Sequence, residues 1–309
     1  MIRKLAFLCV RLTGIPFLVR ELIQKRRVTI VLYHDLHPEV AEQHLQTLKR
    51  SYSVISLREF VQAHQQHQVR KLPAKALIIT LDDGFKGNYE LLSVLTKHRV
   101  PVTIFLCSDI IDTGRHFWWT EAKKGAEPRH LSFLETPDEE RLRLLREVDF
   151  EETREYPDRQ ALQRHEIEAM REVSPSVGRG EVSPSVGRGR LVDLQSHTRF
   201  HPLLPNCSEQ RAWDEISGSK DKLEREYGLD IYALAYPNGA HSERDVALAR
   251  KAGYECAVTT KVGYNAQCTD PYRLKRLGLT DTADVNELLV KTSGVWGWLR
   301  KWIRRPAYE

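Results

Sequence analysis

Four side chains in two short segments could together bind a metal ion and activate water. Asp82 and Asp83 directly follow one apolar run, and His197 and His201 follow another. Adjacent ionised carboxylates at the end of a buried strand need a cation or hydrogen-bond donors, and histidines four residues apart can direct their rings to one point. Two imidazoles and one carboxylate leave coordination positions open for water. The pattern therefore predicts a site for Zn²⁺ or another divalent transition metal.

Each of these segments also has an ordinary structural explanation. A carboxylate pair in a turn is usually a helix cap, and two histidines with this spacing are more often incidental than metal ligands. A third segment, the turn at 237–239, has backbone N–H groups that could face the same site. All three segments follow predicted strands, and this shared placement favours one common site over three unrelated turns.

The segments that must position these residues alternate between apolar runs and stretches of helical periodicity. Strands are predicted at 28–33, 76–81, 101–106, 191–196, 232–236 and 256–260. Helices are predicted at 85–98, 160–172, 208–227, 242–252 and, after the last strand, 283–292. Strands rich in Val and Ile that alternate with helices favour a parallel sheet. Repeated units of this kind predict a β/α barrel, with an open doubly wound sheet as the second choice.

Five segments of the chain resemble one enzyme family. Residues 80–84 (TLDDG), 196–202 (SHTRFHP) and 234–239 (LAYPNG) resemble, in order, the first three motifs of the polysaccharide deacetylase family, the NodB-homology or family-4 carbohydrate esterases. Residues 31–34 (VLYH) and 101–106 (PVTIFL) are similar to that family's first strand and to the strand after its DDG motif. The resemblance implies an α/β fold, a distorted (β/α)7 barrel of the NodB-homology type. It also implies metal-dependent removal of an N-acyl group from an amino sugar.

The resemblance implies a role for each residue that matches a motif. Asp83, His197 and His201 would bind a divalent metal, with Zn²⁺ the first choice and Co²⁺, Ni²⁺ and Mn²⁺ the alternatives. Asp82 would be the general base. This division agrees with physical chemistry, because a carboxylate beside a metal-bound neighbour stays ionised and can accept a proton from water. The backbone N–H of Asn238 would stabilise the oxyanion.

Two departures from the family pattern affect the expected site. Ala235 stands where many members carry an arginine that orients the catalytic aspartate, although a subset has an AYPxG form like this one. The family's late Leu-x-His motif, which supplies the acid for the leaving amine, is absent because no histidine follows His241. His34, at the end of the first predicted strand, is expected to take that role, with His241 as the second candidate. Tyr236 and Asn238 are expected to contact the substrate.

The formal net charge of +5 is unevenly distributed. Residues 1–27 carry seven Lys or Arg and one Glu, a charge of +6, and residues 296–305 carry +4, which leaves −5 for the rest of the 309-residue chain. A mildly acidic body argues against a groove for nucleic acid. Five cysteines without a CxxC pair argue against a disulfide framework or a thiolate zinc site, and they favour a reducing compartment.

Three regions are expected along the chain. These are a basic amphipathic segment at 1–27, a catalytic barrel at 28–292 and a tail rich in Trp and Arg at 293–309. They differ in composition, since only the middle region has the alternation of strands and helices.

Two excursions from the barrel pattern are expected within this middle region. The nonapeptide EVSPSVGRG occurs twice in tandem over 172–189, which predicts an inserted surface loop. The charged stretch 114–156 also departs from the pattern, and its Trp118 and Trp119 could cap the barrel or line a cleft.

Both ends of the chain have the pattern of amphipathic helices. The first has one apolar stripe with a kink expected at Pro16, and the stripe consists of Leu8, Leu12, Ile15, Val19, Leu22 and Ile23. In the second, Trp298 and Trp302 share a face opposite to basic residues. Neither apolar run is long enough for a membrane span, and no signal-peptide pattern is present. We therefore expect peripheral contact of both ends with the inner face of the membrane and a cytoplasmic location, the alternative being that both ends pack on the barrel.

These observations predict a metal-dependent N-deacetylase of an N-acetylated amino sugar, with a glycan or a lipid-linked saccharide as substrate and no role for nucleic acid. Two alternative functions for a protein inside the cell remain open. One is a catalytically inactive NodB-like barrel that binds glycan, and the other is a deformylase of a lipid-linked amino sugar. An exported enzyme that trims a cell-wall or biofilm polymer is a third alternative.

Overall fold

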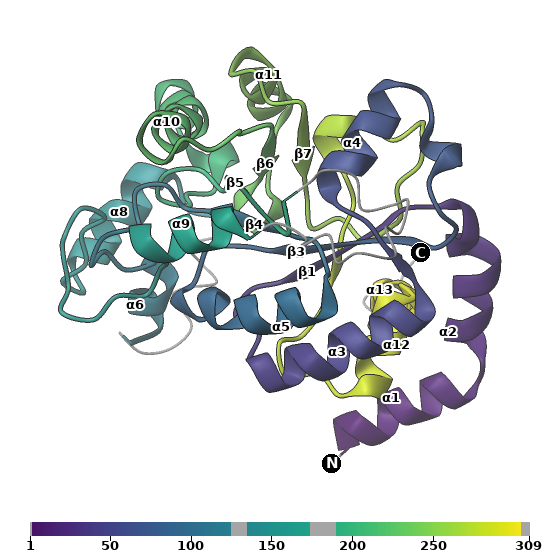
Figure 1. Ribbon diagram of the computed structural model, residues 1–309. Helices are drawn as coiled ribbons and strands as arrows, with labels where there is room; N and C mark the ends of the chain where they lie inside the picture. Colours follow the sequence, from purple (N-terminus) through teal and green to yellow (C-terminus); the bar gives the residue numbers. More distant parts are fainter. Residues whose placement is uncertain (1, 125–134, 174–189, 304–309) are drawn as a thin grey trace, which may run out of the picture.

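The computed structural model describes residues 2–124, 135–173 and 190–303 (Figure 1). Its strands are β1 (Thr29–Tyr33), β2 (Ser53–Val54), β3 (Ala76–Leu81), β4 (Val102–Leu106), β5 (Val192–Ser196), β6 (Ala233–Ala235), β7 (Cys256–Val258) and β8 (Leu277–Gly278). Its α-helices are α1 (Ile2–Leu12), α2 (Ile15–Leu18), α3 (Pro38–Ser51), α4 (Leu57–Gln65), α5 (Leu92–His98), α6 (Trp118–Lys124), α8 (Asp138–Arg146), α9 (Arg164–Glu172), α10 (Glu209–Tyr227), α11 (Glu243–Lys251), α12 (Val285–Thr292) and α13 (Val295–Ile303). Apart from its first two residues, the tandem repeat at 172–189 lies outside the described residues.

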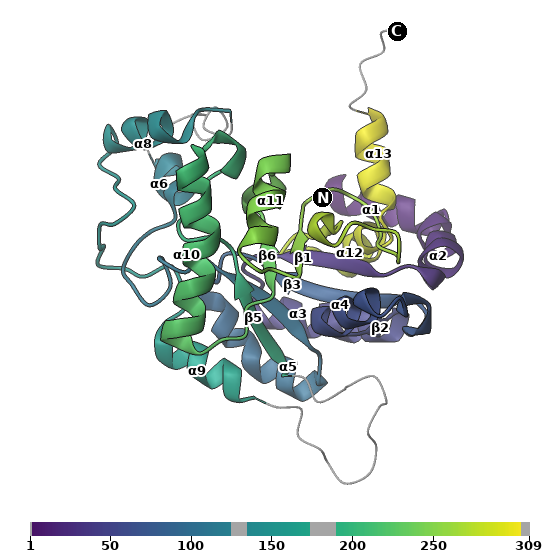
Figure 2. The same ribbon diagram turned by 90° about the horizontal axis from the view of Figure 1, so that it is seen from above.

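One curled parallel sheet forms the centre of the molecule (Figures 1 and 2). The strand order is β7-β6-β5-β4-β3-β1-β8, and β2 pairs with the start of β3. Helices cover the outside of the curl, and the expected distorted (β/α)7 barrel is confirmed. Strands β1, β3 and β4 are buried along their whole length, which is why each appears in the sequence as a continuous apolar run.

The register of the sheet brings the carboxyl ends of β1, β3, β4 and β5 to one edge. Tyr33 pairs with Leu81 at the ends of β1 and β3, and Leu106 pairs with Ser196 at the ends of β4 and β5. The next residue after β5, His197, donates its backbone N–H to Leu106 O at 2.8 Å. The segments that follow β3 and β5 therefore emerge at the same edge of the sheet, on either side of β4.

Several elements were not predicted from the sequence. They are helices α3, α4 and α8 and the two-residue strands β2 and β8. Helices α3 and α4 do place apolar residues at helical spacing, with Ala41, Leu45 and Leu48 buried on α3 and Leu57, Phe60 and Val61 buried on α4. Strand β8 follows β7 in the chain but pairs with β1 at the opposite edge of the sheet, so the strand predicted at 256–260 is not the last one. The helix predicted at 160–172 begins only at Arg164, because the Gln163–Glu166 capping box sets its start.

The N-terminal segment is helical and packs on the C-terminal helices. Helix α1 contacts α12, and the rings of Phe7 and Trp296 lie 4.6 Å apart. The break between α1 and α2 falls at Gly14, whose φ is 72°, and the expected kink at Pro16 is wrong because this proline sits in the first turn of α2. None of the described helices has the length and hydropathy that crossing a membrane requires.

Candidate active site

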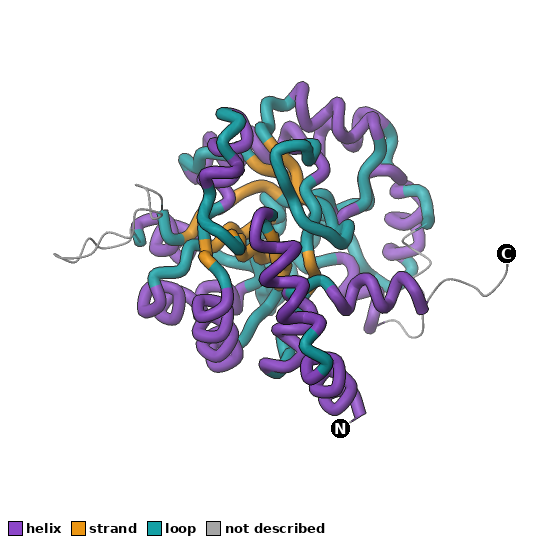
Figure 3. The backbone as a smooth tube through the Cα atoms, turned by 90° about the vertical axis from the view of Figure 1, so that its right-hand side faces the viewer, coloured by secondary structure: helices purple, strands orange, loops and turns teal. Residues whose placement is uncertain are grey.

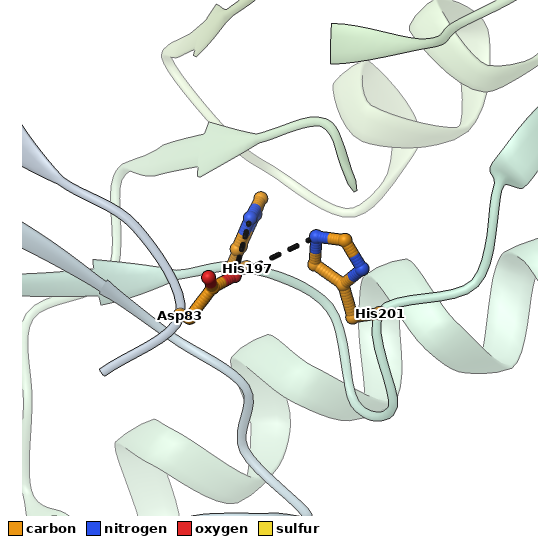
Figure 4. A group of neighbouring side chains, drawn as sticks. All are labelled: Asp83, His197 and His201. Carbon is orange, nitrogen blue, oxygen red and sulfur yellow. Dashed lines mark ion pairs between the residues drawn. The ribbon is translucent and has the colours of Figure 1, made fainter. Parts of the chain in front are cut away.

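Asp83, His197 and His201 converge at the carboxyl edge of the sheet (Figure 4). Asp83 Oδ1 lies 3.4 Å from His197 Nε2 and 3.6 Å from His201 Nε2. One ligand atom from each of the three side chains falls within 4.8 Å of the other two, and all three side chains are buried. The structure thus brings together the three residues that were expected to bind metal.

The backbone of the DDG turn directs the two carboxylates inward. Asp83 has a φ of 75° and Gly84 a φ of 73°, so the chain turns in the left-handed conformation directly after β3. A Cβ atom on Gly84 would lie 2.7 Å from Leu106 Cδ2, which leaves no room for a side chain. Asp82 N donates to Tyr33 O at 3.0 Å and holds the start of this turn on β1.

The loop that carries the two histidines is held by Glu215 of α10. One carboxylate oxygen of Glu215 accepts hydrogen bonds from the backbone N–H groups of Arg199 and Phe200, at 2.8 and 2.9 Å. Thr198 Oγ1 accepts from the backbone N–H of His201 at 3.1 Å. These bonds return the chain toward the site within four residues, so that the second histidine faces the first.

The three side chains fit a divalent metal ion. His197 Nδ1 bonds to Ala235 O at 2.8 Å, which places the ring proton on Nδ1 and leaves the Nε2 lone pair for a metal. Asp83 Oδ1 is buried and makes no hydrogen bond within the part of the chain that the structure describes. A buried carboxylate oxygen between two imidazole nitrogens is the donor set that Zn²⁺ and related ions prefer.

The charges of the site support the same interpretation. Burial would raise the pKa of Asp83, but the ring of His197, 3.4 Å away, and the positive charge that the two histidines can carry bring it below its ordinary value. Burial and the charge on His197 lower the pKa of His201 to about 3. Burial would also lower the pKa of His197, but the carboxylates of Asp82 and Asp83 raise it. Asp83 is therefore ionised and His201 neutral at neutral pH, the forms that bind a cation, and a bound cation would displace the proton that the carboxylates favour on His197.

Asp82 is held by Arg276, a residue that the sequence did not point to. Arg276 Nη1 and Nη2 donate to the two carboxylate oxygens of Asp82, each at 2.7 Å. Arg276 is fully buried, and it also donates to Thr259 O at 2.9 Å and to Thr80 Oγ1 at 3.2 Å. Burial alone would raise the pKa of Asp82, but the charges of Arg276 and His197 hold it at about 2. The carboxylate is ionised and has a fixed orientation.

Many family members carry an arginine in the third motif that orients the aspartate, and Ala235 stands at that position here. In this chain Arg276 orients Asp82 instead. It comes from the segment 274–279 (LKRLGL), whose leucines are buried. An arginine inside an apolar segment was the signal that could have indicated a buried partner. The sequence alone does not say which carboxylate this arginine meets.

A cavity of about 370 Å³ opens above these residues. It is lined by Leu32, His34, Asp82, Asp83, Trp118, Trp119, His197, His201, Leu203, Asn238 and Thr260. The ring of Trp119 lies 4.3 Å from that of His201, and Trp118 Nε1 donates to His201 O at 3.0 Å. The two tryptophans of α6 therefore line the cleft, which was one of the two positions expected for them.

The remaining predicted site residues separate into two groups. His34 and Asn238 line the cavity, and the backbone N–H of His34 donates to Asp281 Oδ1 at 3.1 Å. His241 does not line it, because its ring stacks on Tyr236 and its Nδ1 faces Gly239 O at 3.0 Å. The expectation that the side chain of Tyr236 contacts substrate needs correction: the side chain is fully buried in the hydrophobic core, away from the cavity.

This geometry suits hydrolysis of an unactivated bond. An ionised carboxylate of fixed orientation lies beside a three-residue metal site, with a 3.7 Å distance between Asp82 Oδ2 and His197 Nε2. One carboxylate can thus accept a proton while the neighbouring one binds a cation.

Comparison with known proteins identifies a family for this chain. The sequence model of a family described as "Polysaccharide deacetylase" matches residues 69–257, more than half of the chain. The chain is 28% identical over 211 residues to YxkH of Bacillus subtilis (strain 168), whose name places it among the polysaccharide deacetylases. That match covers 68% of the chain and 53% of the relative, so the chain spans about half the length of this relative.

Solved structures of similar fold cover most of the chain. The Streptococcus pyogenes deacetylase PplD, in complex with acetate, superposes with a TM-score of 0.59 at 19% identity over 86% of the chain and 98% of its own length. IcaB from Ammonifex degensii superposes with a TM-score of 0.57 at 17% identity over 87% of the chain and 97% of its own length. At these identities the likeness concerns the fold.

Proposed function

The chain belongs to the polysaccharide deacetylase family, whose members act on the amide bonds of N-acetyl sugars, and we propose that it is a metal-dependent N-deacetylase of an N-acetylated amino sugar. One observation carries this proposal. Asp83, His197 and His201 form a buried group of side chains that could hold a metal ion, and Asp82, oriented by Arg276, faces the same cavity.

The metal site would supply one part of the chemistry. A divalent ion bound by Asp83, His197 and His201 would act as a Lewis acid toward the amide carbonyl and lower the pKa of a nearby water. The proton transfers and the contact with the oxyanion are assigned to groups of the protein.

Asp82 would accept the proton of the attacking water. Its carboxylate is ionised at neutral pH, and its two bonds to Arg276 keep it from rotating away from the cavity. The backbone N–H of Asn238, in the left-handed turn of η6 (Pro237–Gly239), would donate to the oxyanion that develops on the amide. His34 would donate the proton that the leaving amine needs.

The cavity supports a saccharide substrate. Among its lining residues, Trp118 and Trp119 offer an apolar surface for a sugar ring, and polar groups of Asn238 and Thr260 offer hydrogen-bond partners for its hydroxyl groups. The acetyl group stays a prediction, as does a cytoplasmic location.

The proposal can be tested by measuring bound metal and acetate release on wild type and Asp82→Asn. The substrates are N-acetylglucosamine oligomers and lipid-linked N-acetyl sugars, and formate is measured in parallel for the deformylase alternative. We expect both proteins to bind metal and only the wild type to release acetate, with a loss of about 1000-fold in the variant.

Other outcomes contradict the proposal in different ways. Formate without acetate would identify a deformylase. Metal binding and glycan binding without turnover of any substrate would favour the inactive glycan-binding barrel. Absence of metal binding after reconstitution would overturn the metal site itself.

A further inference from the structure

Most of the exposed large apolar side chains lie on the N-terminal helices. In the described part of the chain ten such side chains are exposed, and eight of them belong to residues 5–23. These eight, here called the apolar face, are Leu5, Leu8, Leu12, Ile15, Phe17, Leu18, Leu22 and Ile23. Leu12 and Leu22 are each 75% exposed. Such a concentration is unusual for a surface that contacts only water.

The apolar face is not the face by which these helices pack on the barrel. Phe7, Pro16 and Val19 point inward and are buried, and Phe7 contacts Trp296 of α13. The packing side of the segment is therefore already occupied, and the apolar face lies on the opposite side. Figure 3 views the molecule from the side that α1 and α2 cover.

Cations border the apolar face at its end. Lys25, Arg26 and Arg27 begin two residues after its last member, Ile23, and together with Arg70 they line a hollow of about 730 Å³ whose lining contains no acidic residue. None of these four side chains forms an ion pair with another described residue. Unpaired cations next to exposed apolar side chains complement a surface that combines phosphate groups with hydrocarbon.

A second cationic hollow connects this side of the molecule with the active site. It has a volume of about 990 Å³, and Lys261, Lys291 and Arg300 are its charged lining residues. Trp296, which packs on α1, also lines it. Two residues of its lining, Asn238 and Thr260, also line the cavity above the metal site.

We propose that the apolar face and its flanking cations bind the surface of an anionic phospholipid bilayer. The apolar side chains enter the boundary between headgroups and acyl chains, and Lys25, Arg26 and Arg27 contact lipid phosphates. The molecule lies on the bilayer, since none of the described helices could cross one. Resting on the proposed function, this placement makes a saccharide anchored in the same bilayer the natural substrate class, because the second hollow leads from the metal site to α13.

The test is sedimentation of the full chain with vesicles of phosphatidylcholine and with vesicles that also contain phosphatidylglycerol. We expect binding to the anionic vesicles, weaker binding to the neutral ones and release by high salt. The double variant Leu12→Gln/Leu22→Gln should lower the partition coefficient about tenfold, because it removes apolar side chains from the interface. Leu12→Met/Leu22→Met is the matched control, since it keeps the apolar character and should bind like the wild type.

Charge is tested separately. Arg26→Gln should weaken binding to the anionic vesicles only, and Arg225→Gln on the distant helix α10 should leave binding unchanged. Circular dichroism and thermal unfolding show whether each variant is folded. A folded wild type that ignores both vesicle types overturns the proposal, and so does a wild-type dimer that becomes monomeric in the Leu→Gln variant, which would identify a second copy as the occupant.

Vesicle binding requires neither metal nor turnover. If the protein binds vesicles but releases no acetate, the docking surface stands and the proposed enzymatic function fails. If it releases acetate from soluble oligomers but ignores vesicles, the function stands and the docking surface fails.

Discussion

Arg276 and Asp82 are joined by two hydrogen bonds of 2.7 Å, although 194 residues separate them in the chain. Their contact links the turn after β3 to the segment that enters β8, and it gives the expected general base a fixed orientation and a buried countercharge.

We expect Arg276→Lys to lower kcat about 10- to 100-fold while metal content stays at the wild-type level. Lysine keeps the charge but cannot make the bidentate contact, so Asp82 loses its fixed orientation. Arg276→Met should also destabilise the protein by about 3–5 kcal/mol, because it leaves Asp82 buried without a countercharge. Steady-state kinetics, metal analysis and chemical denaturation separate these effects. Lys275→Gln, one residue away, is the control. If Arg276→Lys and Lys275→Gln lower kcat equally, this segment matters only for folding.

Removal of the metal should abolish activity. Treatment with a chelator is expected to stop acetate release, and addition of Zn²⁺ should restore it. Asp83→Asn should lower metal affinity at least ~100-fold, because a neutral amide replaces the anionic ligand. His241→Gln should keep full metal content, since His241 stacks on Tyr236 outside the cavity. Metal analysis after dialysis measures the metal content of each variant. Retention of metal by Asp83→Asn would contradict the proposed ligand set.

His34→Gln should affect amide and ester substrates differently. An amine leaving group must be protonated, whereas a good alcohol leaving group needs much less help. We expect a loss of about 100-fold in kcat for the N-acetyl sugar and a loss of only a few-fold for an activated acetate ester. Parallel assays of both substrates test this, with His241→Gln as the matched histidine control. The same loss on both substrates would show that His34 is not the acid.

Gly84→Ala should destabilise the protein more than Gly14→Ala. Both glycines have nearly the same positive φ, 73° and 72°. A Cβ on Gly84 would lie 2.7 Å from Leu106 Cδ2, whereas one on Gly14 would meet nothing within 4 Å. The pair therefore separates the steric clash from the backbone strain common to both. We expect about 1–3 kcal/mol more loss of stability at Gly84, together with weaker metal binding because Asp83 moves. Urea denaturation measures the difference, and equal losses would mean that Leu106 adapts.

His44 should make the stability of the fold depend on pH. Its Nδ1 accepts from Tyr33 at 2.9 Å and its Nε2 donates to Ala283 O at 2.8 Å, an arrangement that requires the neutral ring. Burial lowers the pKa of His44 below its ordinary 6.5, although the Ala283 bond opposes this. The unfolded chain then binds more protons in this range, so stability is fully present above pH 6.5 and is lost as the pH falls toward the lowered pKa.

The variant His44→Gln isolates this contribution. At pH 8 we expect it to be about 1–2 kcal/mol less stable than the wild type, and the difference should shrink as the pH is lowered to 5. Denaturant unfolding at several pH values measures this, with exposed His165→Gln as the control. A difference that stays constant with pH would show that His44 is not held neutral by the fold.

The sequence by itself determined six strands of the barrel and the three residues expected to bind metal. Strands buried on both faces must be continuously apolar, and the carboxyl ends of parallel strands meet at one edge. The DDG and HTRFH segments act through local backbone geometry, which a few adjacent residues specify. For this reason Asp83, His197 and His201 could be selected before any contact was known.

Only the tertiary structure decided the contacts between residues far apart in the chain. It assigned Arg276 to Asp82, placed His34 but not His241 in the cavity, and buried the side chain of Tyr236. It also decided which side of the N-terminal helices faces the barrel. Amphipathic periodicity identifies an apolar stripe but not its partner, and here five of the six predicted stripe residues face away from the barrel while Phe7 and Val19 face it. Such choices depend on which distant surfaces exist to be covered, and that information is not local.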